Sequence, residues 1–237
     1  MKTENYLLPG LERQIEFLFN NHKSTASNIL VVGSNCEEIS KELSRHFDAQ
    51  IDLIVEDYDS LMNSKLLLES SENINVRLME FEVTDFEDAS FDIIYAQASI
   101  SLNKRNKIIK EFNRLLKADG FLCVGEVVTL RKDFPPFVQD IFDSSDLLPL
   151  FADDLEKYYT ERKFNVIVRQ NLSHTLKNYY SSNVRLLDRS IDNLSASEKS
   201  YYKKILNKLS HESNAYLKLG GDKFIGFVVL LLQKGIR

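Results

Sequence analysis

Residues 28–60 read NILVVGSNCEEISKELSRHFDAQIDLIVEDYDS and decide the fold class. Residues 29–32 are a short apolar run rich in β-branched side chains, which is typical of a strand buried on both faces. Gly33 ends this run, and residues 37–47 then place apolar side chains at helical spacing. Residues 52–55 form a second apolar run. The stretch therefore predicts a strand, a tight turn, a helix and a second strand, in that order.

Polar residues follow both of these predicted strands. Two strands joined by a crossover helix lie parallel in one sheet, and the ligands of such sheets bind outside the carboxyl ends of the strands. Gly33, Ser34 and Asn35 follow the first strand, whereas Glu56 and Asp57 follow the second. We therefore expect these two groups of residues to face one ligand-binding cleft.

The rest of the chain continues the alternation of strands and helices. Apolar spacing predicts further strands at residues 76–83, 91–96, 121–128, 164–168 and 224–233. It also predicts helices at residues 11–19, 61–68, 106–116, 138–142 and 152–160, and a long helical region at residues 173–219. Residues 118–120 are expected to cap the helix that precedes them. Seven strands with helices between them indicate an α/β fold with a Rossmann-like, doubly wound sheet.

Composition and charge exclude several classes of protein. The 237 residues include 30 basic and 35 acidic side chains, well mixed, which is not the pattern of a nucleic-acid-binding protein. Cys36 and Cys123 are too few for a disulfide framework or a metal-binding quartet, and they favour a reducing compartment. The N-terminal residues have no apolar signal core, and the apolar run 224–232 is too short to span a bilayer. We expect a cytoplasmic protein with no membrane partner, no nucleic-acid partner and no metal site.

Four stretches carry a resemblance to a known family. They read ILVVGSNCEEISKEL at residues 29–43, VEDYDSLM at 55–62, EFEVTDFEDASFDIIYA at 80–96 and LLKADGFLCVGEVV at 115–128. They resemble, in order, the first motif, the acidic end of the second strand, the acidic loop before the fourth strand and the glycine turn before the fifth strand of class I S-adenosylmethionine-dependent methyltransferases. The ending GDKFIGFVVLLLQKG is similar to the antiparallel last strand of that fold.

The resemblance implies one methyltransferase-like domain over the whole chain. Its core would be a seven-stranded, mostly parallel sheet with an antiparallel last strand, built from residues 25–130, 161–172 and 222–236. Helical cap segments or insertions would occupy residues 1–24, 131–160 and 173–221. A long helical insertion between the last two strands is similar to family members that methylate small molecules.

The resemblance also implies how S-adenosylmethionine, and S-adenosylhomocysteine as the product, would be bound. Backbone N–H groups at Gly33, Ser34 and Asn35 would approach the methionine carboxylate at the start of a helix. Asp57, with Tyr58 beside it, would accept hydrogen bonds from the ribose hydroxyl groups. Glu56 is the alternative to Asp57.

Two further segments would contact the cofactor in this family pattern. Glu82 would accept a hydrogen bond from the adenine amino group while Val83 packs on the ring, and Glu80 is the alternative to Glu82. Residues 96–99, which include Gln97, would lie beneath the sulfonium.

The first motif departs from the family pattern. The family usually has an acidic residue in the place of Val31 and glycines in the places of Asn35 and Glu37, so that only Gly33 is kept. Glycine permits positive φ and lets a ligand approach the backbone. Because asparagine tolerates the left-handed region better than most residues, Asn35 is the milder change. Glu37 brings bulk and negative charge toward a ligand that carries a carboxylate.

Several other side chains have both a functional and a structural interpretation. His174 follows the strand at residues 164–168 and is a candidate base or substrate contact, and Tyr179, with Tyr180 and Arg185 nearby, could line a substrate pocket. A single histidine is more often structural, and tyrosine is common in this part of the chain. Cys36 is either a reactive thiol at a helix start or a small filler residue, and we favour the filler.

The leading functional hypothesis is methyl transfer to a small-molecule acceptor by in-line displacement. Such a reaction needs mainly alignment and a dry site, and a base is required only if the nucleophile loses a proton. The altered first motif leaves a second hypothesis open, a non-catalytic protein of the same fold that binds a partner. A nicotinamide-dependent dehydrogenase fits less well because two of the three glycines of its fingerprint are missing. A homodimer or a complex with another protein is left open.

Overall fold

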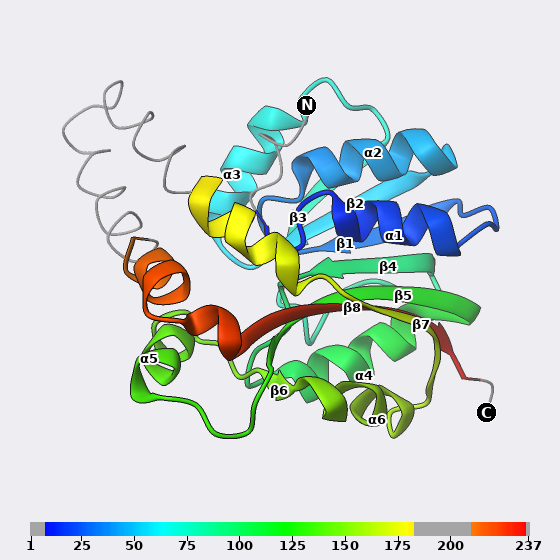
Figure 1. Ribbon diagram of the computed structural model, residues 1–237. Helices are drawn as coiled ribbons and strands as arrows, with labels where there is room; N and C mark the ends of the chain where they lie inside the picture. Colours follow the sequence, from blue (N-terminus) through cyan, green and yellow to red (C-terminus); the bar gives the residue numbers. More distant parts are fainter. Residues whose placement is uncertain (1–7, 183–209, 236–237) are drawn as a thin grey trace.

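A computed structural model of the protein describes residues 8–182 and 210–235. One eight-stranded sheet forms its centre, in the order β3-β2-β1-β4-β5-β8-β7, with β6 paired to β5 (Figure 1). The strands are β1 (Asn28–Val32), β2 (Gln50–Val55), β3 (Ile74–Leu78), β4 (Phe91–Gln97), β5 (Leu116–Thr129), β6 (Leu150–Phe151), β7 (Phe164–Asn171) and β8 (Ile225–Lys234). The predicted Rossmann-like, mostly parallel sheet is confirmed, with β6 as a two-residue addition.

Helices cover both faces of this sheet (Figure 1). On one face lie α1 (Arg13–Asn21) and α2 (Glu37–Phe47), and on the other lie α4 (Arg105–Leu115) and α6 (Leu155–Thr160). The remaining named helices are α3 (Tyr58–Leu67) and α5 (Pro136–Ser144). Helix α2 has the bounds that the apolar spacing predicts.

Strand β8 is apolar along nearly its whole length because it is buried on both faces. Phe227, Val229 and Leu231 belong to the apolar cluster under α1 and α2. Val228 and Leu230 belong to the cluster under α4 and α6. All five side chains have no exposed surface. Burial of this kind stabilises the fold by roughly 1.5–3 kcal/mol for each large aliphatic or aromatic side chain.

The pairing directions bring several strand ends to one edge. Strands β1 to β5 are mutually parallel, whereas β8 is antiparallel to both β5 and β7. Strand β7 therefore runs in the same direction as β5. The carboxyl ends of β1, β2, β4, β5 and β7 all lie on this edge, which is named here the carboxyl edge.

The structure corrects two predicted boundaries. The predicted strand 76–83 ends at Leu78, because β2 ends at Val55 opposite it and offers no further ladder partner. The chain then forms an isolated bridge between Glu80 and Val83. The cap predicted at residues 118–120 is also wrong. Helix α4 ends at Leu115, and the next residue is already extended and pairs with β4.

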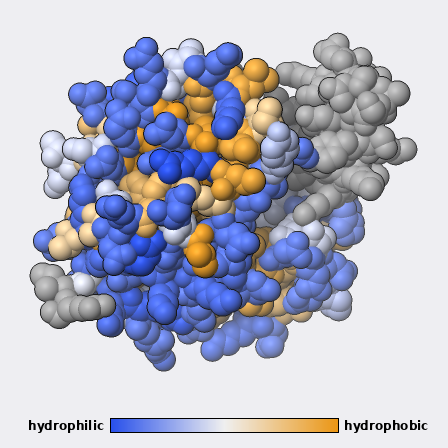
Figure 2. Space-filling view, turned by 180° about the vertical axis from the view of Figure 1, so that it is seen from behind, coloured by the Kyte–Doolittle hydropathy of each residue, from blue (hydrophilic) through white to orange (hydrophobic). Residues whose placement is uncertain are grey.

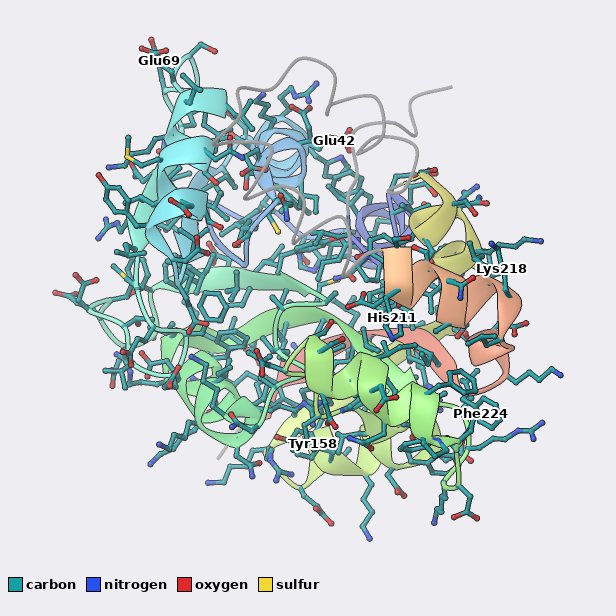
Figure 3. All side chains as sticks on the ribbon, turned by 90° about the vertical axis from the view of Figure 1, so that its left-hand side faces the viewer. Glu42, Glu69, Tyr158, His211, Lys218 and Phe224 are labelled. Atoms are coloured by element: carbon teal, nitrogen blue, oxygen red, sulfur yellow. The ribbon has the colours of Figure 1, made fainter. Side chains whose placement is uncertain are left out.

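The predicted helical region 173–219 lies only partly within the part of the chain that the structure describes. Residues 173–175 form a 3-10 turn, and residues 176–182 and 210–218 are helical. The second of these helical segments carries His211 and Lys218 (Figure 3). Arg185 lies outside the described residues.

Apolar side chains on α3 and β3 are unusually exposed. Tyr58, Met62 and Leu66 follow one another at four-residue intervals along α3 and are each at least half exposed, and Leu78 of β3 is exposed nearby. Figure 2 shows apolar side chains gathered on the upper part of the face seen from behind. Within residues 8–182 and 210–235, no helix is long and apolar enough to cross a membrane.

Candidate active site

The turn after β1 has an unusual backbone. Gly33 has a φ of 120°, and a Cβ atom built there would lie 2.7 Å from Cβ of Ser99. Any other residue would therefore combine backbone strain with a collision. Asn35 has a φ of 62°, in the left-handed region that the family's glycine would also tolerate. The change from glycine to Asn35 thus keeps the shape of the turn.

The start of α2 presents backbone N–H groups beside this turn. Cys36 is the N-cap residue of this 11-residue helix, and its side chain makes no capping hydrogen bond. A helix start without a side-chain cap leaves N–H groups for an anionic ligand, and the helix dipole favours negative charge there.

The side chain of Glu37 points away from the turn. Glu37 is 8% exposed, and its Oε1 accepts a hydrogen bond of 2.5 Å from Oγ of Ser64 on α3. The added carboxylate is therefore used between two helices. Cys36 is fully buried. Burial raises the pKa of its thiol far above the ordinary range, and the charge of Glu37 raises this pKa further. Cys36 is thus a packing residue and not a reactive thiol.

Asp57 and Tyr58 lie at the end of β2, on the carboxyl edge. Asp57 is the N-cap of α3, and its Oδ1 accepts a hydrogen bond of 2.8 Å from the backbone N–H of Ser60. One carboxylate oxygen is thus engaged in capping, while the side chain as a whole remains exposed. Tyr58 is 64% exposed.

Glu82 and Glu56 meet the same lysine. Nζ of Lys104 lies 2.5 Å from Oε1 of Glu56 and 2.8 Å from Oε2 of Glu82. Lys104 is the N-cap residue of α4. Glu82 is thus ion-paired, whereas Val83 beside it is 70% exposed and the alternative Glu80 is exposed.

The end of β4 holds the N-terminal segment against the carboxyl edge. Nε2 of Gln97 donates hydrogen bonds to the carbonyl oxygens of Pro9, at 2.8 Å, and Leu11, at 3.0 Å, and its Oε1 accepts one from the hydroxyl of Tyr95. The amide nitrogen of Gln97 therefore anchors residues 9–11, and its oxygen is held by Tyr95. A direct contact of this side chain with a cofactor would require these bonds to break.

Ser99 lies against the turn after β1, and Ala98 precedes it. Ala98 has a φ of 56°, a conformation that costs energy for a residue other than glycine, and its N–H donates to the carbonyl of Gly125 at 2.9 Å. Oγ of Ser99 is buried and has no hydrogen-bond partner among the residues that the structure describes. This hydroxyl lies beside Gly33, since a Cβ atom built on Gly33 would be 3.3 Å from it.

Sequence reasoning missed a charged network that lies beneath the carboxyl edge. Glu126 of β5 is completely buried and pairs with Nε of Arg105 at 2.9 Å. Its oxygens also accept hydrogen bonds from Oγ of Ser101, at 2.9 Å, and from the hydroxyl of Tyr159, at 2.5 Å. Burial, and then the charge of Glu126, raises the pKa of Tyr159, which therefore stays protonated and donates.

A weak signal for this network exists in the sequence. Glu126 is the one charged residue within the apolar run 121–128, and a charge inside a buried strand needs a partner. No distinguishing pattern marks the polar stretch before the predicted helix 106–116. This stretch contains Ser101 and Arg105, which are partners of Glu126, and Lys104, which contacts Glu56 and Glu82.

The structure does not place His174 and Tyr179 in contact with the turn after β1. His174 is exposed in the 3-10 turn that follows β7, on the carboxyl edge. Tyr179 is partly buried, and its ring contacts Tyr180 with centroids 5.0 Å apart. Tyr180 in turn stacks on Tyr216 at 4.6 Å, which joins the two helical segments on either side of residues 183–209.

A cavity of about 390 Å³ opens at the end of β5. Its walls include Phe134, Phe142 and Phe151, with Lys132 and Asp154 among the polar residues. Another cavity of similar volume lies at the start of β3, next to Leu68 and Ile74, and so at the opposite edge of the sheet. For residues 8–182 and 210–235, no group of three or more metal-ligating side chains is found.

Comparison with known proteins agrees with this geometry. Residues 30–124 match a family model described as a methyltransferase domain. This range contains the turn after β1, the end of β2, the Lys104 contacts and β4. No curated protein sequence matches the chain.

Solved structures with low sequence identity share the whole fold. A putative sarcosine dimethylglycine methyltransferase from Galdieria sulphuraria has a TM-score of 0.75 at 18% identity, covering 94% of this chain and 84% of that one. The [4+2]-cyclase SpnF has a TM-score of 0.77 at 16% identity, covering 95% and 81%. Phosphoethanolamine N-methyltransferase 2 of Haemonchus contortus, in complex with S-adenosylhomocysteine, has a TM-score of 0.78 at 11% identity, covering 98% and 55%.

These likenesses establish the fold, and the family match adds the motif region. The sheet order, the antiparallel last strand and the match over residues 30–124 all agree with a methyltransferase-like fold. Residues 30–124 therefore match a methyltransferase domain, and the chain as a whole has the fold of the solved structures named above.

Proposed function

We propose that the protein transfers the methyl group of S-adenosylmethionine to a small-molecule acceptor at the carboxyl edge of its sheet. The observation that carries this proposal is the turn after β1. Gly33 has no room for a side chain, Asn35 is left-handed, α2 starts without a side-chain cap, and the buried hydroxyl of Ser99 lies beside Gly33. A ligand with a carboxylate and an ammonium group suits these donors and this acceptor.

Each of the predicted cofactor contacts has a place in this proposal. Gly33, Ser34 and Asn35 would hold the methionine carboxylate through backbone N–H groups. Asp57 has one carboxylate oxygen engaged in capping and a second that would accept from the ribose, next to Tyr58. Residues 96–99 would lie beneath the sulfonium and contact it with backbone atoms, since the Gln97 side chain is already hydrogen-bonded to Pro9 and Leu11.

The adenine end would be formed by the segment between β3 and β4. Glu82 would accept from the adenine amino group, and the exposed Val83 would pack on the ring and lose its contact with water. Burial would raise the pKa of Glu82, but its bond to Lys104, a backbone hydrogen bond and the charges of Lys104 and Lys107 together outweigh burial and lower the pKa. Glu82 is therefore ionised at neutral pH and able to accept.

The cofactor supplies an electrophilic methyl group, so the chain has mainly to align the acceptor and exclude water. The cavity at the end of β5 lies on the same edge, and its volume of about 390 Å³ suits a small molecule. His174 and Tyr179 remain candidates for contact with the acceptor, and a base is needed only if the acceptor must lose a proton.

Titration calorimetry with S-adenosylhomocysteine tests the cofactor site. Asp57→Asn keeps a good N-cap for α3 but removes the charge that would face the ribose. We expect it to weaken binding at least about tenfold, equivalent to about 1.4 kcal/mol. Asp59→Asn is the matched control, because Asp59 is an exposed carboxylate in the same turn of α3.

The outcomes of this titration separate the hypotheses. Equal affinity of Asp57→Asn and the wild type would remove Asp57 from the site and leave Glu56 as the ribose acceptor. No binding of either S-adenosylmethionine or S-adenosylhomocysteine by a folded wild type would overturn the proposal and favour a non-catalytic role for the same fold.

A further inference from the structure

Three charged side chains from separate parts of the chain meet at the carboxyl edge. Lys104 lies between Glu56, which follows β2, and Glu82, which lies between β3 and β4, at 2.5 and 2.8 Å. This group is named here the Lys104 bridge. The side chains are 27%, 28% and 15% exposed in that order, so the bridge is partly shielded from water.

Further contacts hold the Lys104 bridge in place. Oε1 of Glu56, the same oxygen that contacts Lys104, accepts a hydrogen bond of 3.0 Å from the backbone N–H of Phe81. Nζ of Lys104 lies 5.9 Å from the centroid of the Phe81 ring, within reach of a cation–π contact. Burial alone would lower the pKa of Lys104, but its bonds to the two carboxylates raise the pKa. The ammonium therefore stays charged.

The Lys104 bridge engages one carboxylate that the proposed function assigns to the cofactor and a second that is the alternative ribose acceptor. Glu82 is assigned to the adenine amino group, and Glu56 is the alternative acceptor for the ribose hydroxyl groups. An ammonium group, an adenine amino group and a ribose hydroxyl are all hydrogen-bond donors, so they compete for these oxygens.

We propose that Lys104 is an internal competitor of the cofactor, whose ammonium occupies the adenosine end of the site and must leave Glu82, and Glu56 with it, before adenosine binds. This inference rests on the proposed function, because it concerns the same site. It assigns to Lys104 a role in setting the affinity for the cofactor and none in the methyl transfer step.

The exchange is energetically feasible for these groups. Ion pairs between partly exposed side chains are weak, because water screens them and long side chains lose freedom when they are held. The lysine stem is flexible, and its ammonium is well hydrated once it reaches water. Glu82 does not stay unpaired, because the adenine amino group takes the place of the ammonium, and Glu56 keeps its hydrogen bond from the backbone N–H of Phe81.

Calorimetry on Lys104→Met tests the competition. Methionine keeps most of the length of the side chain and removes the cation. We expect S-adenosylhomocysteine to bind this variant about tenfold more tightly than the wild type, which corresponds to about 1.4 kcal/mol. Lys104→Arg retains a cation that can pair with both carboxylates, and its Kd is expected to stay near the wild-type value.

Lys107→Met is the matched control. Lys107 is an exposed lysine one turn further along α4, and its charge also acts on Glu82 without a hydrogen bond. If direct contact between the ammonium and Glu82 sets the affinity, Lys107→Met keeps the wild-type Kd. If both methionine variants tighten binding equally, the effect is one of net charge and the proposal is wrong.

Salt gives a second readout that does not depend on a variant. Added sodium chloride screens the Lys104 bridge, so that wild-type affinity should rise with salt while the affinity of Lys104→Met should not. Binding by the wild type that weakens in Lys104→Met would show that Lys104 supports the cofactor, and would overturn this inference alone. Failure of both folded proteins to bind S-adenosylhomocysteine would overturn the proposed function.

Discussion

At the scale of single residues, Asn35 shows how a substituted motif can keep its shape. The family pattern has glycine at this position, and Asn35 still adopts a φ of 62°. Its side chain is exposed, so it makes no demand on packing. The neighbouring Gly33 is different, because a Cβ there would meet Ser99. The two positions therefore differ in what they tolerate, although both have positive φ.

Substitution of Asn35 tests this conformational argument. Asn35→Ala is expected to lower the free energy of unfolding by about 1 kcal/mol, because alanine pays the full cost of the left-handed region. Asn35→Gly should keep the wild-type stability or exceed it slightly. Urea unfolding monitored by circular dichroism measures both. Equal stability of the alanine and glycine variants would show that the φ of residue 35 is not a constraint.

At the scale of elements, the end of α1 joins the first helix to the sheet through an aromatic cluster. His22 is the C-cap residue of α1, and its backbone N–H donates to the carbonyl of Leu18. Its ring lies 4.6 Å from that of Phe121 and 5.7 Å from that of Phe47. Nε2 is buried and finds no hydrogen-bond partner within the described ranges 8–182 and 210–235. A neutral imidazole suits this position better than a charged one.

The pH dependence of stability should report this histidine. Burial lowers the pKa of His22, an effect that its bond to Ser24 and the charge of Asp92 only partly oppose. Because the unfolded chain then binds the proton more tightly, His22 contributes stability above about pH 6.5 that is lost as the pH falls toward its lower folded-state pKa.

His22→Phe should remove this part of the pH dependence, since phenylalanine is neutral at every pH and fits an aromatic cluster. Chemical denaturation of wild type and variant from pH 7.5 to 5 measures the difference. His46→Gln, which removes an exposed imidazole from α2, is measured under the same conditions for comparison. If His22→Phe loses stability as steeply as wild type, His22 is not the titrating group.

At the scale of the whole molecule, the network around Glu126 joins elements that are far apart in the sequence. Glu126 belongs to β5, Arg105 to α4, Tyr159 to α6 and Ser101 to the segment before α4. Arg105 also donates through Nη2 to the carbonyl of Leu148 at 2.6 Å. The network thus fixes the segments that border the carboxyl edge on the side of the β5 cavity.

Glu126→Gln is expected to destabilise the protein by about 3–5 kcal/mol, because it leaves the buried charge of Arg105 without a counter-charge. Glu156→Gln is the matched control, since it breaks an exposed pair with Arg169 and should cost less than about 1 kcal/mol. Thermal and urea unfolding compare the two.

Restoring charge balance offers a further check on this network. A double variant, Glu126→Gln with Arg105→Met, should recover part of the loss because no unpaired charge remains buried. Similar losses of stability in Glu126→Gln and Glu156→Gln would show that the buried pair contributes no more to stability than the exposed pair.

Much of the fold follows from local patterns in the sequence. Continuous apolar runs predict β1, β2, β4 and β8, because strands buried on both faces are made mainly of apolar side chains. Helical spacing predicts α2 at its observed bounds. The carboxyl edge follows from the strand–helix–strand order and the rules of parallel sheets, so residues 33–35 and 56–57 are placed together without any knowledge of side-chain contacts.

The pairing of charged and polar side chains was decided only in three dimensions. Glu56 and Lys104 are 48 positions apart, and Gln97 reaches Pro9 across 88 positions. Such contacts depend on where turns direct each side chain, and no periodic pattern records this. The sequence therefore determined the sheet and the edge where we propose that a ligand binds, because apolar burial is a local and repetitive signal. The tertiary structure alone decided which carboxylates at that edge are already engaged, because hydrogen bonds depend on the meeting of particular atoms.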